Sequence, residues 1–522
     1  MEPAPTTAAA GGIAAMARRA PDKPAMILGD DVRTYGELDA RVNRLARALA
    51  RAGVGAGDRV AVALHNSFEW FEALNALGRL GALLVPLSYR GKGPELAYMI
   101  ADSGAKLLIA DPRLAPEIDR ALAALPLADD LVWVAGDDRP WRGASLEERI
   151  AAEEASPPDG ALPGGGYNVM IYTSGTTGRP KGIERAPLPP DRVQLQMLGV
   201  ARMWGFGEDD VHLVAGPVYH TAPGSQGQVH LMLGATIVIM PRFDAEACLR
   251  LVARHRITNA QMVPAMFFRI LGLAEDVRSR YDLSSIRKIL HAAAPCPVAV
   301  KQAIMQVFPP GTVWEFYGAS EGGATRIGPE DWLRKPGSVG TPWPGLRVEI
   351  RDDDGRALPP GEIGTIWISL TPGASFSYRG AEEKTRTAIR GEFFSVGDMG
   401  YLDRDGFLFI ADRKIDMIIT GGANVYPAEV EEALHRHPAV LDVAVIGVPD
   451  DEMGESVKAI VELKPGAAAT AEELIAFCRR DLAHYKCPRT VDLVAELPRE
   501  PQGKVLKRVL REPYWAGRDK RV

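Results

Sequence analysis

Apolar residues near the start of the chain recur at the spacing of one helix face. Residues 34–37, Thr-Tyr-Gly-Glu, form a capping box, in which the threonine and the glutamate satisfy backbone N–H groups at the start of a helix. The apolar positions that follow at helical spacing are Leu38, Val42, Leu45 and Leu49. Gly53 then interrupts the pattern. The pattern therefore predicts a helix that begins after Thr34 and ends at Gly53.

Short apolar runs alternate with helical stretches along the next part of the chain. Runs of strand length lie at residues 59–64, 83–87 and 106–110, and a helical stretch at 70–80 separates the first two. Similar runs follow at residues 236–240, 257–263, 286–291 and 312–317. This alternation predicts a mostly parallel sheet covered by helices. Because ligands of such sheets bind outside the carboxyl ends of the strands, we expect the site in the loops that follow these runs.

The pattern changes from Val339 onward to short strands with turns at residues 352–355 and 359–361, which indicates a β-rich module. A separate core pattern begins after Arg413, with the apolar runs 443–448, 457–463 and 491–497 and a helical stretch at 472–482. The predicted fold class is therefore α/β. A large N-terminal domain, 1–413, holds mixed, helix-covered sheets and a β-rich subdomain at 339–413, and a small α+β C-terminal domain spans 414–522.

Composition narrows the choice of partners and compartment. A chain of 522 residues is too long for one core. Its net charge of −6 gives no reason to expect nucleic acid or an anionic membrane. The four cysteines include no C-x-x-C pair, and no run of 18 or more apolar residues occurs, so neither a zinc site nor a membrane span is expected. The residues at the start lack the order of a secretory signal, and we expect a cytoplasmic protein.

Residues 172–182, Tyr-Thr-Ser-Gly-Thr-Thr-Gly-Arg-Pro-Lys-Gly, follow an apolar run and combine hydroxyls, glycines and cations. Glycines let backbone N–H groups approach an anion closely, and hydroxyls and Lys181 add further donors. A Walker P-loop has a glycine, four residues and then Gly-Lys-Ser/Thr. The stretch does not match this motif, because Gly178 is followed by Arg179-Pro180-Lys181. It is interpreted as a phosphate-binding loop, with a flexible surface loop as the alternative.

Together with later motifs, this loop resembles that of the ATP-dependent adenylate-forming (AMP-binding) superfamily, in particular its acyl-CoA synthetase branch. The resemblance runs from about Thr34 to Lys507, with the motifs in the family's order. It implies an enzyme that takes ATP, Mg²⁺, CoA and a small carboxylic acid, and whose small C-terminal domain is mobile. A homodimer is left open.

By this resemblance, the first loop holds the β- and γ-phosphates of ATP through Thr173, Ser174, Gly175, Thr176, Thr177, Gly178 and Lys181. The resemblance also implies that Thr173 contacts the Mg²⁺ ion. The motif His291-Ala292-Ala293-Ala294-Pro295 resembles the loop beside adenine, with Ala293, Ala294 and Pro295 against the base. Its alternative interpretation is a packed strand end.

The motif at residues 316–321, Phe-Tyr-Gly-Ala-Ser-Glu, is similar to the family's Tyr-Gly-x-Thr-Glu, with serine in place of threonine. It implies that Tyr317 stacks on adenine, that Gly318 contacts the nucleotide, that Ser320 bonds a phosphate oxygen and that Glu321 is a ligand of Mg²⁺. Asp398 would accept hydrogen bonds from the ribose hydroxyls. Arg413 would contact the ribose and phosphates.

Three further motifs resemble parts that act when the C-terminal domain moves. Ile415 stands at the hinge position, where the family usually has Lys or Asp. The ease with which the C-terminal domain rotates between the two half-reactions is therefore in question. Gly421 and Gly422 lie in a stretch that resembles the wall of the CoA (pantetheine) tunnel. Lys504 matches the catalytic lysine, although Glu500 replaces a more usual Thr or Asn. Without the other motifs, Lys504 would be read as a solvated lysine at the start of a helix.

Another region bears on which carboxylic acid and which thiol the enzyme takes. Tyr219 and His220 resemble an aromatic-histidine element of CoA ligases, and no aspartate that would hold a substrate amine occurs at residues 221–230. The alternative for His220 is a structural histidine. The expected acyl pocket is lined by uncharged and mostly small residues, Tyr219, Gly224, Gly322 and Gly323. The expected acid is a medium-to-long fatty, alicyclic or aromatic acid. The alternatives are an acid:AMP ligase that feeds a carrier protein and a non-catalytic nucleotide-binding regulator.

Overall fold

The computed structural model describes residues 12–125, 127–136, 140–162, 168–173, 180–186, 189–371, 374–499 and 505–516. The chain divides into two compact units that interleave in sequence. The first unit holds the chain up to Met262 together with Leu273–Ile289 and Ala374–Thr385. The second holds Val263–Gly272, Leu290–Gly373 and the chain from Arg386 onward. Residues from 414 onward lie within the second unit, and a domain division at 413 stays a prediction.

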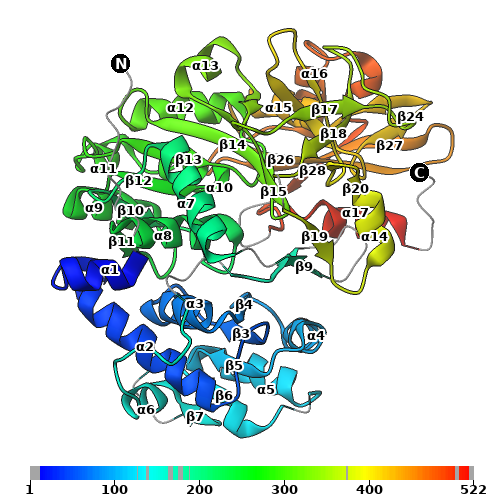
Figure 1. Cartoon of the computed structure of the whole chain (residues 1–522). Coiled ribbons are helices and arrows are strands. Elements are labelled where there is room, and N and C mark those ends of the chain that lie inside the picture. Colours follow the sequence, from blue (N-terminus) through cyan, green and yellow to red (C-terminus); the bar gives the residue numbers. More distant parts are fainter. Residues whose placement is uncertain are drawn as a thin grey trace. The chain divides into compact units, whose positions relative to one another are not determined.

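The predicted helix-covered parallel sheet is present in the first unit (Figure 1). The helix α2, Tyr35–Arg51, starts at the capping box of Thr34 as expected. The sheet has the strand order β4-β3-β5-β6-β7. Its strands are β3 (Arg59–Ala63), β4 (Leu83–Pro86), β5 (Leu107–Ala110), β6 (Val132–Val134) and β7 (Ala144–Ser145).

Both faces of this sheet are buried under helices. On β3, Val60 and Val62 belong to one apolar core with α2 and with α3 (Phe68–Leu80). Ala61 and Ala63, which point to the opposite face, belong to another core with α4 (Gly93–Ser103) and α5 (Ala115–Leu122). The continuous apolar runs of these strands follow from this burial on both faces.

A second sheet region of the first unit has the strand order β2-β1-β11-β10-β12. Strand β10 pairs in parallel with β11 and with β12, and β11 pairs in parallel with β1. The bounds are β1 (Pro24–Leu28), β2 (Asp31–Thr34), β10 (Val211–Val214), β11 (Thr236–Ile239), β12 (Asn259–Met262) and, next along the chain, β13 (Lys288–His291). The runs predicted at 236–240, 257–263 and 286–291 therefore form strands.

The second unit contains an antiparallel meander in the order β14-β15-β16-β23-β22-β18. The bounds are β14 (Val313–Ala319), β15 (Gly322–Ile327), β16 (Ser338–Pro342), β18 (Gly364–Ser369), β22 (Asp398–Leu402) and β23 (Leu408–Arg413). One expectation is corrected here: the strand predicted at 312–317 does not open into a loop after Tyr317. It continues to Ala319 and returns as β15, because Gly318 lets the two strands approach closely.

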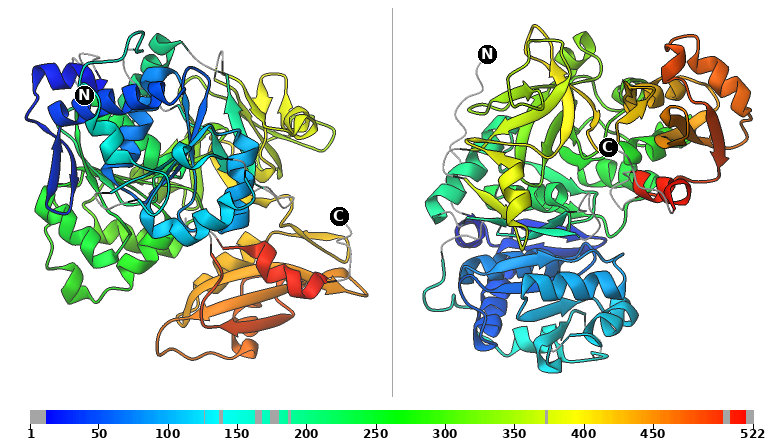
Figure 2. Two further views of the ribbon diagram at one scale, coloured as in Figure 1. Left: turned by 90° about the horizontal axis from the view of Figure 1, so that it is seen from below. Right: turned by 90° about the vertical axis from the view of Figure 1, so that its right-hand side faces the viewer.

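The chain after Arg413 forms its own sheet, in the order β25-β24-β27-β26, with β28 paired to β27. The strands are β24 (Ile418–Thr420), β25 (Ala423–Val425), β26 (Val440–Asp450), β27 (Gly454–Leu463) and β28 (Thr490–Val494). One face packs on α15 (Pro427–His435) and α16 (Ala471–Cys478). The other face is covered by α17 (Lys507–Trp515), which lies across the strands in Figure 2. Among the described residues, no helix has the length and apolarity to span a membrane.

Candidate active site

The ends of the predicted phosphate loop are held by a β-hairpin in the first unit. Strands β8 (Ile171–Thr173) and β9 (Lys181–Arg185) are antiparallel, and Thr173 pairs with Lys181. The expected strand before the loop is therefore present. Between these two residues, the predicted phosphate ligands Ser174, Gly175, Thr176, Thr177 and Gly178 lie outside the described residues.

Side chains that the sequence analysis did not identify anchor this hairpin. The Tyr172 hydroxyl donates a hydrogen bond to Asp102 Oδ2 at 2.6 Å. Arg379, which follows β19 (Phe376–Tyr378), donates to Glu184 Oε1 at 2.7 Å, and β19 pairs with β9. Arg59 also donates to Glu184, at 2.9 Å. Because these partners are far apart along the chain, no local sequence signal indicated them.

In the second unit, three predicted nucleotide residues come together at the carboxyl end of β14. The Tyr317 hydroxyl donates to Asp398 Oδ2 at 2.6 Å, and Arg413 Nε lies 3.4 Å from Asp398 Oδ1. Asp398 and Arg413 are paired residues of β22 and β23. Burial raises the pKa of Tyr317 well above its usual value, and the adjacent Asp398 carboxylate raises it further. The phenol therefore stays protonated and acts as a donor to Asp398.

Ser320 and Glu321 form the two-residue turn between β14 and β15, where Ala319 pairs with Gly322. A Cβ atom at Gly318 would lie 3.0 Å from the Gly322 carbonyl oxygen and from the Gly323 Cα atom, which explains glycine at this position. The turn thus presents a hydroxyl and a carboxylate immediately beyond Tyr317. This geometry is the turn of a hairpin, whereas the sequence predicted a loop after the strand.

The alanine loop after β13 carries backbone strain. Ala293 has φ of +78°, a left-handed conformation that costs an alanine on the order of 1 kcal/mol or more. Ala293 and Pro295 are exposed and Ala294 is half-buried. This combination is typical of a site that the surrounding structure holds in shape, rather than of a packed strand end.

Tyr219 and His220 belong to a chain of neighbouring aromatic rings in the first unit. His65 stacks on Tyr89 at 4.4 Å between ring centroids, Tyr89 meets Tyr219 edge-on at 5.1 Å, and Tyr219 lies 4.3 Å from His220. His220 is the N-cap residue of α8 (Thr221–Leu233). Burial, reinforced by the positive charge of Arg90, lowers the pKa of His220 to about 3, so its ring is neutral at physiological pH.

The predicted tunnel glycines form the turn of the hairpin between β24 and β25. Gly421 and Gly422 have φ of +56° and +80°, and Thr420 pairs with Ala423 around them. Two consecutive positive φ values define the type I′ turn that favours glycine. Open space surrounds the position of a Cβ atom at Gly422. The turn conformation therefore explains glycine here, and a role in a tunnel stays a prediction.

The hinge and the catalytic lysine can be assessed only from their neighbours. Ile415 is 42% exposed, as expected for a side chain outside the core. Lys504 lies outside the described residues, but Arg499 and Val505 on either side of its segment form an antiparallel bridge. Arg499 in turn pairs with Asp442 on β26. The base of the segment is thus attached to the C-terminal sheet.

The residues predicted to line the acyl pocket have distinct surroundings. Gly224 is buried within α8. In the second unit, a Cβ atom at Gly322 would lie 3.1 Å from Phe394, and one at Gly323 would overlap the Trp343 indole. Packing against aromatic rings therefore explains both glycines, and their contact with an acid stays a prediction.

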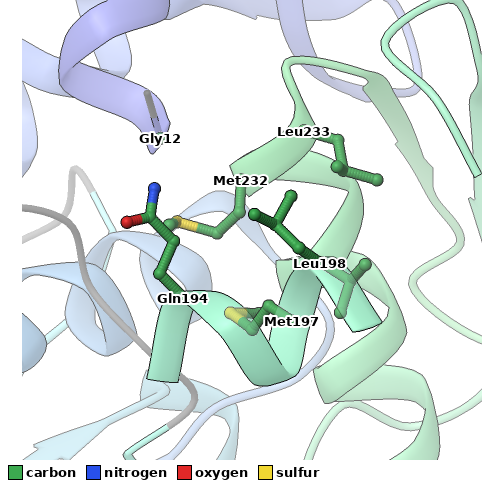
Figure 3. Close-up of a pocket in the computed structure, with 7 residues that line it drawn as sticks. Gly12, Gln194, Met197, Leu198, Met232 and Leu233 are labelled. Carbon is green, nitrogen blue, oxygen red and sulfur yellow. The ribbon is translucent and has the colours of Figure 1, made fainter. Parts of the chain in front are cut away.

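A pocket in the first unit lies among α8, α7 (Pro190–Trp204) and α1 (Gly12–Arg19) (Figure 3). None of the predicted acyl-pocket residues lines it. Its lining is mostly apolar and consists of Gly12, Gln194, Met197, Leu198, Val229, Met232 and Leu233. We do not assign it to the acid.

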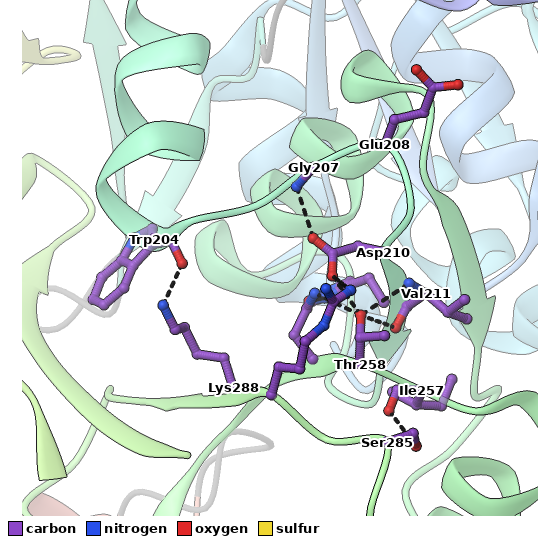
Figure 4. A network of polar contacts seen from close by, with 12 residues as sticks. Trp204, Gly207, Glu208, Asp210, Val211, Ile257, Thr258, Ser285 and Lys288 are labelled. Carbon is purple, nitrogen blue, oxygen red and sulfur yellow. Dashed lines mark hydrogen bonds and ion pairs between the residues drawn. The ribbon is translucent and has the colours of Figure 1, made fainter. Parts of the chain in front are cut away.

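A polar network in the first unit is structural rather than catalytic (Figure 4). Asp210 accepts hydrogen bonds from the Gly207 amide at 2.8 Å, from the Thr258 hydroxyl at 2.6 Å and from Arg287 at 2.7 Å. These residues lie just before the first residues of three strands: Asp210 before β10, Thr258 before β12 and Arg287 before β13. Ligands of parallel sheets bind at the opposite, carboxyl ends.

Comparison with known proteins identifies the family. A profile described as AMP-binding enzyme matches residues 13–375, and one described as AMP-binding enzyme C-terminal domain matches residues 429–504. The chain belongs to the AMP-binding enzyme family. The predicted superfamily is therefore confirmed. The α/β fold class and the enzyme class, an AMP-forming acid–thiol ligase, are confirmed by similar solved structures and by relatives named as CoA ligases, and the alternative of a non-catalytic regulator is set aside.

Relatives and solved structures cover almost the whole chain. A feruloyl-CoA synthase of an Amycolatopsis species is 37% identical over 95% of this chain and 97% of its own. A fatty acid–[acyl-carrier-protein] ligase of Streptomyces coeruleorubidus is 31% identical over 97% of this chain and 96% of its own. The crystal structure of an anthranilate CoA ligase in complex with anthranoyl-AMP superposes with a TM-score of 0.86, at 29% identity and 97% coverage of both chains.

Proposed function

We propose that this enzyme activates a non-amino carboxylic acid with ATP to an acyl-AMP and pyrophosphate, and then transfers the acyl group to CoA with release of AMP. The observation that carries the proposal is the cluster of Tyr317, Asp398 and Arg413 in a chain of the AMP-binding family. An acceptor-only carboxylate held by a phenol suits two ribose hydroxyls. The adjacent guanidinium suits the phosphate side of the nucleotide.

In the first half-reaction, a carboxylate oxygen of the acid attacks the α-phosphorus of ATP, and pyrophosphate leaves. This in-line step is accelerated mainly by positioning and by stabilisation of charge. Thr173 and Lys181 stand at the two ends of the loop that is proposed to hold the leaving pyrophosphate. Lys504 is proposed to bridge the attacking carboxylate and the α-phosphate.

Glu321 fits the role of a Mg²⁺ ligand. Mg²⁺ is commonly bound by one or two carboxylates together with substrate phosphates and water, rather than by a cage of protein ligands. Glu321 offers one carboxylate at a partly exposed turn, and no group of three or more His, Cys, Asp or Glu side chains suited to a metal occurs in the described part of the chain. When bound, Mg²⁺ would neutralise phosphate charge, and Ser320 would donate to a phosphate oxygen.

In the second half-reaction, the thiol sulfur attacks the acyl carbon, AMP leaves, and the thiol proton is released. We propose that rotation about the segment at Ile415 removes Lys504 and brings Gly421 and Gly422 to the thiol. His220 is neutral and its Nε2 atom is buried without a hydrogen-bond partner in the described structure. It can therefore offer a hydrogen bond to the acid or the thiol without adding a charge.

The acid is proposed to be a fatty, alicyclic or aromatic one. No aspartate lies at residues 221–230 of α8 to hold a substrate amine. The relatives named for ferulate and for fatty acids are consistent with an apolar acid.

The decisive experiment measures pyrophosphate release across a panel of carboxylic acids, with and without CoA, followed by mass analysis of the products. We expect pyrophosphate with at least one apolar acid and a thioester only when CoA is present. Release that depends on no acid in the panel would contradict the proposal.

A carrier protein is the second candidate acceptor, because one relative is named as an acid–[acyl-carrier-protein] ligase. The same experiment separates the two acceptors. Acyl-AMP that accumulates with CoA, but is consumed when a phosphopantetheinylated carrier protein is added, would favour the carrier.

A further inference from the structure

Three buried ionisable side chains of the second unit lie next to the alanine loop. Lys301 Nζ lies 2.5 Å from Glu315 Oε2, and His291 Nε2 lies 3.6 Å from the same oxygen. Lys301 and His291 are fully buried and Glu315 is 7% exposed. We call these three residues the buried ionic support.

The buried ionic support connects both ends of the alanine loop to one strand. His291 is the last residue of β13, just before the loop, and Lys301 lies in the first turn of α12 (Val298–Val307), just after it. Glu315 lies on β14. The Glu315 carboxylate is therefore bonded to Lys301 after the loop and lies beside His291 before it, and Ala293 between them is held at a positive φ.

The same carboxylate is linked to the side chain expected to stack on adenine. Residues two apart on a strand point to the same face, so Glu315 and Tyr317 share a face of β14. Glu315 therefore sets the position of the alanine loop relative to the strand that carries Tyr317. The Lys301 ammonium also lies over the Trp332 ring, 4.6 Å from its centroid, which fixes the cation from a second side.

Stability alone does not explain these buried charges. Burial costs an ion pair so much that apolar residues of similar volume are often equally stable or more so. Burial lowers the pKa of Lys301 and raises that of Glu315, which shows that each charge is opposed by its surroundings. Neither ring nitrogen of His291 has a hydrogen-bond partner in the described structure, and burial lowers its pKa well below the usual value. An arrangement this unfavourable points to positioning.

We propose that Lys301, Glu315 and His291 are positioning residues that hold the alanine loop and Tyr317 at the separation of an adenine ring. The proposal rests on the nucleotide site of the proposed function. It assigns adenine affinity to residues that do not themselves touch the nucleotide.

The test compares AMP binding by calorimetry and the KM values for ATP and for the acid in two double variants. Lys301→Met/Glu315→Gln removes both charges of the support without leaving one unpaired. We expect its AMP dissociation constant and its KM for ATP to rise about tenfold or more, a change of the size that a modest loss of preorganisation produces. The KM for the acid should change less than about twofold, and the preference for AMP over GMP should narrow.

The control, Lys458→Met/Asp492→Asn, removes a lysine–carboxylate pair elsewhere in the second unit. It joins the neighbouring strands β27 and β28, and its nitrogen and oxygen are 2.7 Å apart. Its nucleotide constants should stay at the wild-type values. If Lys301→Met/Glu315→Gln does not fold, Glu315→Asp keeps both charges but moves the carboxylate, and should still weaken AMP binding about threefold.

Wild-type AMP affinity in a folded support variant would overturn the proposal and leave the three residues a purely structural role. Because AMP binding needs no acid, this outcome is distinct from failure of the proposed function. If the wild-type enzyme binds AMP but releases no acid-dependent pyrophosphate, the proposed acid-activating function is refuted. The AMP affinity of the support variants would still test the positioning role. Wild-type protein that binds no AMP would overturn both.

Discussion

Asp398 is the side chain that connects two other predicted nucleotide residues of the second unit, Tyr317 and Arg413. One carboxylate oxygen accepts a hydrogen bond from the Tyr317 hydroxyl, and the other oxygen lies near the Arg413 guanidinium. At 9% exposure, its carboxylate is stabilised by these partners. The Tyr317 hydroxyl donates to Asp398, and the ring is proposed to contact adenine, so substitutions can test the two parts separately.

Asp398→Asn should weaken AMP binding by about 10- to 100-fold, because a hydrogen bond to a charged group contributes about 1.5–3 kcal/mol. Tyr317→Phe keeps the ring and should cost less than Tyr317→Ala. Calorimetric titration with AMP checks both changes. A Tyr317→Phe variant as weak as Tyr317→Ala would show that the hydroxyl, rather than the ring, carries the affinity.

Lys504→Ala should slow acyl-AMP formation by at least the ~10²–10³ that is typical of losing one preorganised donor. Attack of CoA on supplied acyl-AMP should be largely spared, because Lys504 is expected to leave the site before that step. Single-turnover measurements of each half-reaction check this, with Arg508→Ala at an exposed position of α17 as a neighbouring control. Equal loss in both half-reactions would contradict the assignment of Lys504 to adenylation alone.

Two-residue turns provide several of the predicted site residues. Ser320 and Glu321 join β14 to β15, and Gly421 and Gly422 join β24 to β25. A short turn between paired strands places its side chains more reproducibly than a long loop does. The strands β8 and β9, on either side of the predicted phosphate loop, are joined by a longer segment of chain, so the side chains that anchor these strands matter more.

Arg379→Gln should raise the KM for ATP about three- to tenfold with little change in the KM for the acid, since it removes the charge that holds Glu184 on β9. Arg379 is 31% exposed in its side chain, so only a small loss of stability is expected. Steady-state kinetics with ATP varied provides the measurement. The exposed arginine Arg386 on α14 (Glu382–Ala388) supplies the control, Arg386→Gln. Equal effects of the two substitutions would argue against an anchoring role.

Elements with a local signal were predictable from the sequence. The capping box at Thr34 correctly placed the start of α2, and the apolar runs at 59–64 and 443–448 correctly indicated β3 and β26. The return of β14 into β15 was not predicted, because it depends on the close approach of Gly318 and Gly322.

The site was predictable where a motif is contiguous and not where contacts are long-range. Tyr317, Asp398 and Arg413 were named from separate motifs, and the structure brings them together. Arg379 and Glu184 are 195 positions apart, and nothing in either neighbourhood indicates the other. Strand pairing alone connects them, so the hairpin anchors could be found only in the structure.

Buried histidines make the stability of the first unit depend on pH. His212 and His230 stack at 4.1 Å between ring centroids and are at most 1% exposed. Burial lowers the pKa of His230 to about 4 and, together with His230, lowers that of His212 well below its usual value. An unfolded histidine has a pKa of about 6.5, so the unfolded chain binds more protons as pH falls below that value. Stability is therefore full above about pH 6.5 and falls as pH decreases toward 4.

His230→Gln should reduce the loss of thermal stability between pH 7 and pH 5, because a histidine contributes up to about 1.4 kcal/mol per pH unit in this range. The measurement is the unfolding temperature of the variant and the wild type at both pH values. The exposed His484 gives the control, since His484→Gln should leave the pH dependence unchanged. An unchanged slope in His230→Gln would mean that the acid sensitivity comes from other groups.

The proposed movement of the C-terminal domain requires the segment around Ile415 to change its backbone conformation. Helix α17, which begins shortly after Lys504, is attached to this segment. Arg511 donates to the Ile415 carbonyl oxygen at 3.2 Å and pairs with Asp416. Lys507 pairs with Glu431 at 2.8 Å. Burial alone would lower the pKa of Lys507, but the carboxylates of Asp412, Glu431 and Asp416 raise it, so the ammonium is firmly held.

Arg511→Met should therefore change the rate of the thioester step while leaving adenylation within about twofold, because it frees the Ile415 carbonyl from α17 without touching the nucleotide residues. Ile415→Lys should act on the same step and spare adenylation. The exposed Arg508 on the same helix provides the control, and Arg508→Met should alter neither half-reaction. The half-reactions are measured separately, as pyrophosphate burst and as thioester formed from supplied acyl-AMP. A large adenylation defect in Ile415→Lys would mean that the pivot lies elsewhere, because a change at the pivot should affect domain rotation before the thioester step and not adenylation.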